Sequence, residues 1–217
     1  MPSPMRDAPR VGVLAGLPVH PSGLVVPYAT LCVPDDGSDP VTTVRTELGH
    51  ELRCACVYGQ GKPRFGRPCI DRQRQCMRQG RCSVCGHRVR PAKGGMLFLG
   101  VGVTTVPPGV EVPASIEPPV HPVCAAYSTL VCPRVIEDNA EIVVAAAASY
   151  EVRKFVTFPV LPTGPRMLAL HEPVPYSGVA QEYAAVLPRH GVSKTPLHDW
   201  MTHRAPQPYR RLYIDRM

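Results

Sequence analysis

The sequence predicts an α+β fold, namely a small, mostly β domain with short helices and proline-rich loops. Three observations lead to this class. The 217 residues include 27 prolines, more than twice the usual share, and proline ends helices and interrupts sheet pairing. Apolar residues make up 44% of the chain, enough for one core. They come in short runs separated by glycine and proline, which favours strands of a few residues.

The first part of the chain predicts strands. Residues 11–33 hold two apolar runs interrupted by glycine and proline, and each run predicts a short strand. A polar loop follows at 34–40, by its composition. Residues 41–59 then predict a short strand or helix, followed by a strand that ends at Tyr58.

The segment 69–80 gives the clearest helix prediction before the middle of the chain. It contains good helix formers, follows a proline and ends at Gly80, as a C-terminal cap would. Helical spacing places Cys69, Cys76 and Met77 on one face. We expect the arginines of this helix to lie on the other face, toward solvent.

The remaining elements follow from composition in the same way. Residues 94–106 are β-rich and predict one arm of a hairpin, and the proline-rich stretch 107–120 predicts extended chain. Residues 142–161 predict a strand pair, although their alanines also admit a helix. Short helices are predicted at 121–133, 177–187 and 196–204.

Positive charge is concentrated in one window. The formal net charge is +7, and the window from Lys62 to Lys93 holds ten lysines or arginines and a single acid, Asp71. Such a block suits a phosphate backbone or an acidic protein surface, although it could also be a solvated face without a partner. The candidate nucleic-acid contacts are Arg64, Arg67, Arg72, Arg74, Arg78, Arg81, Arg88 and Arg90.

Nine cysteines in a chain of this kind favour metal binding over disulfides. The first residues lack the apolar segment of a signal peptide, and no run approaches the ~20 apolar residues that span a membrane. We therefore expect a cytoplasmic protein with no membrane contact, in a compartment that keeps thiols reduced.

The motif RCSVCGHR (81–88) supplies half of a candidate zinc site. Cys82 and Cys85 are spaced to reach one ion from a tight turn, and the glycine behind them suits that turn. His121 and Cys124 repeat the spacing at the start of a predicted helix. The order of cysteine knuckle, β-rich segment and helix resembles a treble-clef zinc finger. His87 is a rival fourth ligand, and a redox dithiol is the alternative for the cysteine pair.

The other cysteines admit two interpretations. A second zinc ion could bind Cys54, Cys56, Cys69 and Cys76, whose spacing is C-x-C-x12-C-x6-C. Alternatively these four pack as small apolar side chains, which is the interpretation that we favour. Cys32 and Cys132 are predicted to be core residues.

We expect a single zinc-organised domain at 11–204. It lies between a disordered tip, residues 1–10, and a basic, mobile tail, residues 205–217.

Several stretches resemble a group of uncharacterised proteins from actinobacteria and their phages. They are GLPVHPSGLVVPY (16–28), GKPRF (61–65), GRCSVCGHRV (80–89) and PPVHPVCAAYSTLVCP (118–133). The group pattern is GLPV, then CxxCG, then HxxCAxYAxxxCP, and the match runs in order over about 16–200. The resemblance implies a zinc-binding fold and no established activity. The extra cysteines and the heavier basic block depart from the group.

The sequence favours a zinc-stabilised, non-catalytic binding protein whose basic face, 62–93, contacts nucleic acid. The alternative is a structural or interaction module, bacterial or phage-encoded, that binds an acidic protein. A nuclease of the HNH type would use a similar frame, but the segment 94–116 has no histidine to act as a general base. Motifs of serine hydrolases and P-loop enzymes are also absent from the sequence.

Overall fold

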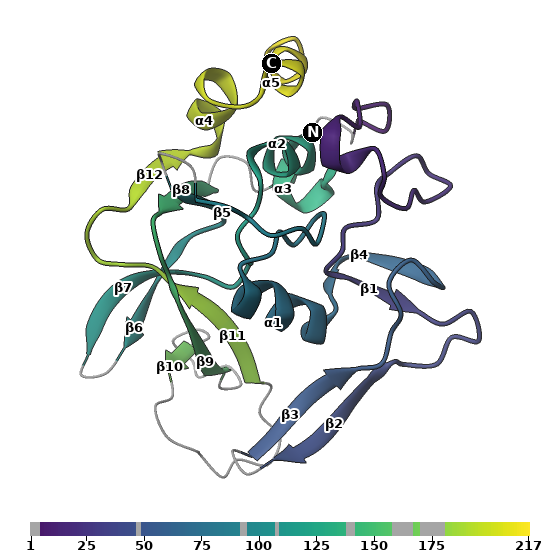
Figure 1. Cartoon of the computed structure of the whole chain (residues 1–217), viewed down its shortest axis with the longest axis vertical. Helices are drawn as coiled ribbons and strands as arrows, with labels where there is room; N and C mark the ends of the chain where they lie inside the picture. Colours follow the sequence, from purple (N-terminus) through teal and green to yellow (C-terminus); the bar gives the residue numbers. More distant parts are fainter. Residues whose placement is uncertain are drawn as a thin grey trace.

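The computed structural model combines helices with mostly antiparallel sheets, which confirms the α+β class (Figure 1). It describes residues 5–46, 49–91, 95–106, 109–137, 142–157, 167–169 and 181–217. Within the described part of the chain, no helix is both long enough and apolar enough to cross a membrane.

A closed barrel forms one end of the molecule. Its strands are β6 (Gly102–Val106), β7 (Val110–Ser115), β9 (Glu151–Thr157), β10 (Met167–Ala169) and β11 (Gln181–Val186). They follow the order β10-β6-β7-β11-β9, and the contact between β10 and β6 is parallel. The prediction of a helix at 177–187 is therefore wrong for residues 181–186, which form β11. Pairing with β9 and β7 buries Ala184 and Ala185 and overrides the helix propensity of these alanines.

A three-stranded sheet lies between the barrel and the helical end of the molecule. It has the order β12-β8-β5 and consists of β5 (Met96–Leu99), β8 (Val143–Ala147) and β12 (Ser193–Pro196). Both strands predicted in 142–161 are present, but they do not pair with each other. The first, β8, belongs to this sheet, and the second, β9, belongs to the barrel.

Two smaller ribbons complete the β structure. The ribbon of β2 (Val41–Thr46) and β3 (Gly49–Cys54) extends away from the core, and β1 (Thr30–Val33) pairs with β4 (Lys62–Pro68) (Figure 1). Only the second of the two strands predicted in 11–33 forms. Near Val11 the chain makes a short 3-10 helix at Gly12–Leu14, where Gly12 has a positive φ of 56°.

Helix α1 (Ile70–Gln79) has the predicted position and ends at Gly80, which adopts the left-handed conformation with φ 62°. The prediction that its arginines face solvent is wrong for two of them. Arg72 and Arg74 are 8% and 5% exposed, because α1 packs against β3 and β11 rather than lying on the surface.

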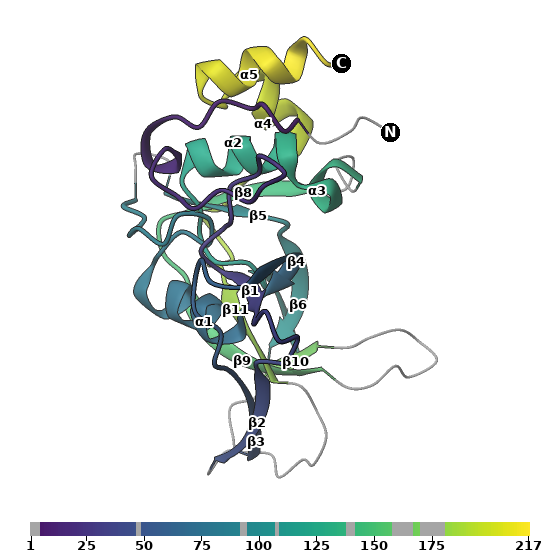
Figure 2. The ribbon, with the colours of Figure 1, turned by 90° about the vertical axis from the view of Figure 1, so that its right-hand side faces the viewer.

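The main core lies among the remaining helices and the three-stranded sheet. Helix α2 (Pro122–Val131) is buried along most of its length, α3 (Pro133–Glu137) follows it, and α5 (Gln207–Ile214) packs on α2. Helix α4 (Leu197–His203) matches the prediction for 196–204. Figure 2 shows α2, α4 and α5 gathered at one end of the molecule.

Residues 5–10 and 205–217 pack on this core, contrary to the prediction of a disordered tip and a mobile tail. Residues 1–4 lie outside the described residues, but the amide of Met5 donates to the carbonyl of Leu130 and Ala8 is buried. Tyr209 of α5 is fully buried, and its hydroxyl donates to the carbonyl of Pro9 at 2.6 Å. Its ring also meets that of Tyr127 edge to face, at 6.3 Å between centroids.

This packing makes Tyr209 a sensitive test of the C-terminal helix. Tyr209→Ala should lower the free energy of unfolding by about 3–5 kcal/mol, because it leaves a large cavity. Tyr209→Phe should cost about 1 kcal/mol through the lost hydrogen bond. Ile214→Ala, at a half-exposed position of the same helix, should change stability by less than about 0.5 kcal/mol. Urea denaturation measures all three, and equal stability of Tyr209→Ala and the wild type would show a mobile tail.

Candidate metal centre

The cysteine knuckle is a tight turn closed by backbone hydrogen bonds. The amide of Gly86 donates to the carbonyl of Cys82 at 2.9 Å, and the amide of Cys82 donates to the carbonyl of His87 at 2.8 Å. Gly86 has a φ of 72°, and a Cβ there would lie 2.9 Å from the ring of Tyr28. Glycine is therefore required behind the second cysteine both by backbone conformation and by space.

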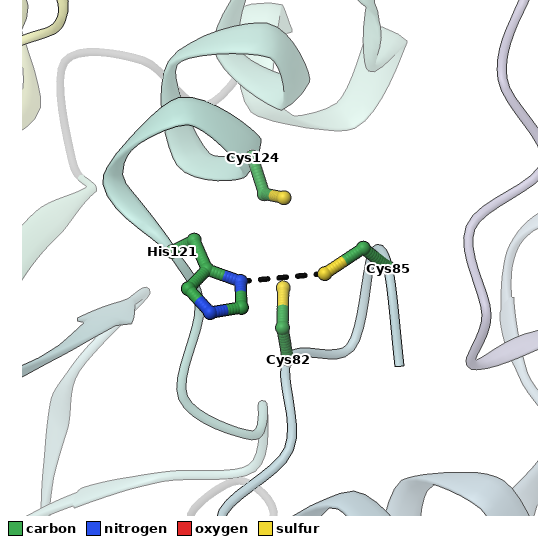
Figure 3. Close-up of side chains that lie close together, drawn as sticks. All are labelled: Cys82, Cys85, His121 and Cys124. Carbon is green, nitrogen blue, oxygen red and sulfur yellow. Dashed lines mark hydrogen bonds between the residues drawn. The ribbon is translucent and has the colours of Figure 1, made fainter. Parts of the chain in front are cut away.

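The second pair of side chains comes from the first turn of α2. His121 is the N-cap residue, Pro122 follows at the first helical position, and the amide of Ala125 donates to the carbonyl of His121 at 2.9 Å. Proline is well suited to that position because its φ fits a helix and its missing N–H needs no partner there. Cys124 then points out of the same turn toward the knuckle (Figure 3).

The structure brings Cys82, Cys85, His121 and Cys124 together around a common centre (Figure 3). One ligand atom from each lies within 4.8 Å of all the others, and Cys85 Sγ is 3.3 Å from His121 Nδ1. A tetrahedral ion with metal–sulfur bonds of about 2.3 Å separates its ligand atoms by about 3.8 Å. Small movements thus convert this cluster into a four-coordinate site, and it could hold a metal ion.

His121 is oriented for this role by the chain after the knuckle. Its Nε2 lies 3.3 Å from the carbonyl oxygen of Arg88. Because a carbonyl only accepts, Nε2 is the donor in this contact, and Nδ1 is the ring nitrogen that faces the sulfurs. Nδ1 can donate to a thiolate while it is protonated and can bind a metal ion once that proton is lost. An outer partner of this kind fixes the tautomer and ring orientation of metal-binding histidines.

The electrostatics of the cluster favour negative sulfur. Burial alone raises the pKa of the Cys82 thiol, but hydrogen bonds from Cys124, Cys85 and His121 outweigh it and hold that pKa well below its usual range. Hydrogen bonds with Cys82 and Cys85 raise the pKa of His121 to about 10. Hydrogen bonding to Cys82 and Cys85 raises the pKa of Cys124. The cluster therefore attracts positive charge, whether as protons or as a metal cation.

The chain between the two ligand pairs departs from a treble clef. That motif places a β-hairpin between the knuckle and the helix. Here β5 pairs with β8 and makes a single bridge to Val120, whereas β6 and β7 form a hairpin that belongs to the barrel. The rival ligand His87 is exposed and is not part of the four-residue group.

A second group of thiols forms from three of the four remaining candidates. Sulfurs of Cys54, Cys56 and Cys69 lie within 4.8 Å of one another. Cys76 is not with them, because α1 turns it toward the knuckle, where its sulfur contacts the carbonyl of Cys82 at 3.7 Å. Cys32 is buried as predicted, but Cys132 is only half-buried, at the end of α2.

The predicted nucleic-acid contacts divide into three sets. Arg72 and Arg74 are buried, and Arg81 is half-buried, bonded to the Gln79 side chain and the Gly86 carbonyl. Lys93 lies outside the described residues. The exposed members are Arg64, Arg67, Arg78, Arg88 and Arg90.

The buried arginines have roles that the sequence reasoning missed. Arg74 lies 3.6 Å from a Glu51 carboxylate oxygen and 3.5 Å from one of Asp71, with its guanidinium over the Tyr183 ring at 4.7 Å. Nη2 of Arg72 donates a hydrogen bond to Cys56 Sγ at 3.1 Å. Helical spacing could have predicted that Arg72 is buried, because it lies three positions after Cys69 and so shares the buried face of the helix.

Comparison of the chain with protein families, curated proteins and solved structures finds no match. The resemblance to the actinobacterial and phage proteins therefore stays a prediction.

Substitution of one ligand tests the centre. Cys124→Ala should abolish metal binding at this site and remove cooperative unfolding, because the remaining donors cannot complete four-fold coordination. Cys132→Ala is the matched control, eight residues further along the chain and outside the cluster, and should keep both properties. Metal content by mass spectrometry and urea denaturation are the measurements. Wild-type metal content and stability in Cys124→Ala would contradict the assignment.

Proposed function

We propose that this protein is a non-catalytic binding protein, that a structural zinc ion at Cys82, Cys85, His121 and Cys124 stabilises it, and that its exposed basic side chains contact nucleic acid. The donor set supports zinc over other metals. Three thiolates and one imidazole are soft to borderline ligands, and zinc takes them in tetrahedral geometry without redox chemistry. All nine cysteines are free thiols, which is in keeping with a reducing compartment such as the cytoplasm.

A closed site supports a structural role. Catalytic zinc keeps one coordination position for water or substrate, whereas structural zinc has four protein ligands. Here four side chains meet, and the three sulfur ligands are 0–6% exposed. A substrate would have to displace a protein ligand to reach the ion, so we assign the metal no step in a reaction.

The observation that carries the binding role is a set of exposed cations that form no ion pair with the described residues. We call it the open basic set: Lys62, Arg64, Arg67, Arg88 and Arg90. All five are exposed, and none makes an ion pair with a residue that the structure describes. Arg72 and Arg74 no longer count toward this surface, since they lie inside. The remaining charge is free to meet a polyanion, and phosphate is the most common one.

The contact is expected to read the phosphate backbone rather than base sequence. Phe65, on β4 between two arginines of the open basic set, is 38% exposed and packs edge-on against the ring of His20 at 5.7 Å. One partly covered aromatic is a poor platform for stacking single-stranded bases. Lysine and arginine contacts to phosphate give affinity without sequence specificity, and double-stranded DNA is a suitable probe.

Neutralising two arginines of β4 tests the proposal. The double variant Arg64→Gln/Arg67→Gln should weaken binding to a DNA duplex and reduce the slope of log affinity against log salt by about 2, one unit for each lost phosphate contact. Fluorescence anisotropy over a salt series measures both quantities. A matched loss of two charges, Arg204→Gln/Arg211→Gln, lies on the C-terminal helices, remote from β4 (Figure 1), and should leave the slope unchanged.

Equal slopes for the two double variants would refute a phosphate contact at β4. If the wild-type protein does not bind DNA but binds an acidic protein in a charge-dependent manner, the partner is an acidic protein rather than nucleic acid.

A further inference from the structure

Three cysteines converge at a place that the four-ligand centre does not use. Cys54 is the last residue of β3, Cys56 follows it by two residues, and Cys69 is the N-cap residue of α1, directly after β4. Their backbone is held firmly, since the amide of Cys54 donates to Asp71 Oδ2 at 2.9 Å and the amide of Cys69 donates to the carbonyl of Ala29 at 2.6 Å. All three sulfurs lie within 4.8 Å of one another.

A buried guanidinium lies beside this cluster. Arg72 is 8% exposed, and its Nη2 lies 3.1 Å from Cys56 Sγ. Its other bonds go to backbone carbonyls, of Tyr28 at 2.7 Å, Thr30 at 2.6 Å and Cys56 at 2.9 Å. Among the described residues, no carboxylate lies within ion-pair distance of it.

This arrangement contrasts with the neighbouring arginine of the same helix. Arg74 is equally buried, and it has Glu51 and Asp71 as counter-ions. A buried cation needs a compensating anion, because removing an unpaired charge from water costs far more than one hydrogen bond returns. For Arg72 the sulfur of Cys56 is the neighbour able to carry that charge, so the cluster is expected to be anionic.

Charge balance then indicates what the cluster holds. Three thiolates around a divalent ion carry a net charge of −1, and the guanidinium of Arg72 brings the site to neutrality. Three neutral thiols would leave Arg72 with backbone carbonyls and the rings of Tyr28 and Tyr58, at 5.9 and 5.7 Å, but with no anion among the described residues. A disulfide would use two of the sulfurs, leave the third without a role and remove the negative charge. Three sulfurs brought together from two segments of the chain, 54–56 and the start of α1, match a metal site better than three neutral thiols or a disulfide.

We propose that Cys54, Cys56 and Cys69 bind a second zinc ion, with Arg72 as its buried counter-charge and a fourth position that an exchangeable ligand such as water fills. The fourth donor is not among the described cysteines, histidines and acidic residues. Cys54 and Cys56 are half-exposed, so solvent reaches this side of the site. The ion would fasten the base of the β2–β3 ribbon to the start of α1 (Figure 1).

The second site does not rest on the proposed nucleic-acid contact or on the first centre. The number of zinc ions per chain distinguishes one occupied site from two. Protein purified under reducing conditions without added metal should contain two zinc ions per chain by mass spectrometry. Cys56→Ser should retain one, and Cys132→Ala should retain two. One zinc in the wild type that disappears in Cys124→Ala and persists in Cys56→Ser would overturn the proposal.

Two measurements on the native side chains cover the case in which a cysteine variant fails to fold. Iodoacetamide should label Cys54 and Cys56 only after a chelator is added, and equal labelling with and without chelator would contradict metal binding there. A disulfide among the three cysteines in protein purified without reductant would identify a redox site instead.

Arg72→Gln tests the counter-charge. It should weaken zinc binding at the second site by about 10- to 100-fold, as removal of an outer partner does, and leave the first site unchanged. Arg78→Gln, an exposed position on the same helix, is the control. Competition with a zinc indicator measures both affinities. An unchanged zinc affinity of the second site in Arg72→Gln would show that Arg72 is not its counter-charge.

Discussion

We expect the fold to depend most on the contact between the cysteine knuckle and the first turn of α2. Cys85 and His121 are 36 residues apart in the chain and 3.3 Å apart in space. A structural zinc site contributes an apparent 10–16 kcal/mol, whereas a domain of ordinary size is stable by about 5–15 kcal/mol in total. If zinc fills the site, its binding energy is comparable to the entire stability of the protein.

Other parts of the structure are tied to the same knuckle. The amides of Tyr28 and Ala29 donate to the carbonyls of Val84 and Ser83, so the N-terminal segment lies along the turn. The amide of Val89 donates to the carbonyl of Gly80 at the end of α1. An ion at this site would join α2 to the knuckle, and backbone hydrogen bonds already tie the N-terminal segment and the end of α1 to that knuckle. Loss of the ion is expected to loosen all of them together.

Sequence reasoning worked where chemistry is local. Ligand spacing of i and i+3, the glycine behind Cys85 and the αL glycine at the end of α1 are short-range signals, and the structure places these residues as expected. Sequence reasoning failed where long-range packing determines the secondary structure or the burial of a segment. The QEYAAV segment of β11 has helix-forming residues, yet barrel pairing extends it, and the C-terminal segment looked like a tail because only Tyr209 and Tyr213 reveal its buried side. Charge alone likewise could not show that Arg72 and Arg74 point inward.

The dependence of folding on free zinc tests the central role of the metal most directly. If one ion binds the native state at this centre and is released on unfolding, each tenfold rise in free zinc should add about 1.4 kcal/mol to the free energy of unfolding. Using Cys56→Ser as the background isolates the first centre. Urea denaturation in zinc buffers supplies the measurement. A free energy of unfolding that stays constant across several decades of free zinc would contradict the account, because it would show that the fold stands without the ion.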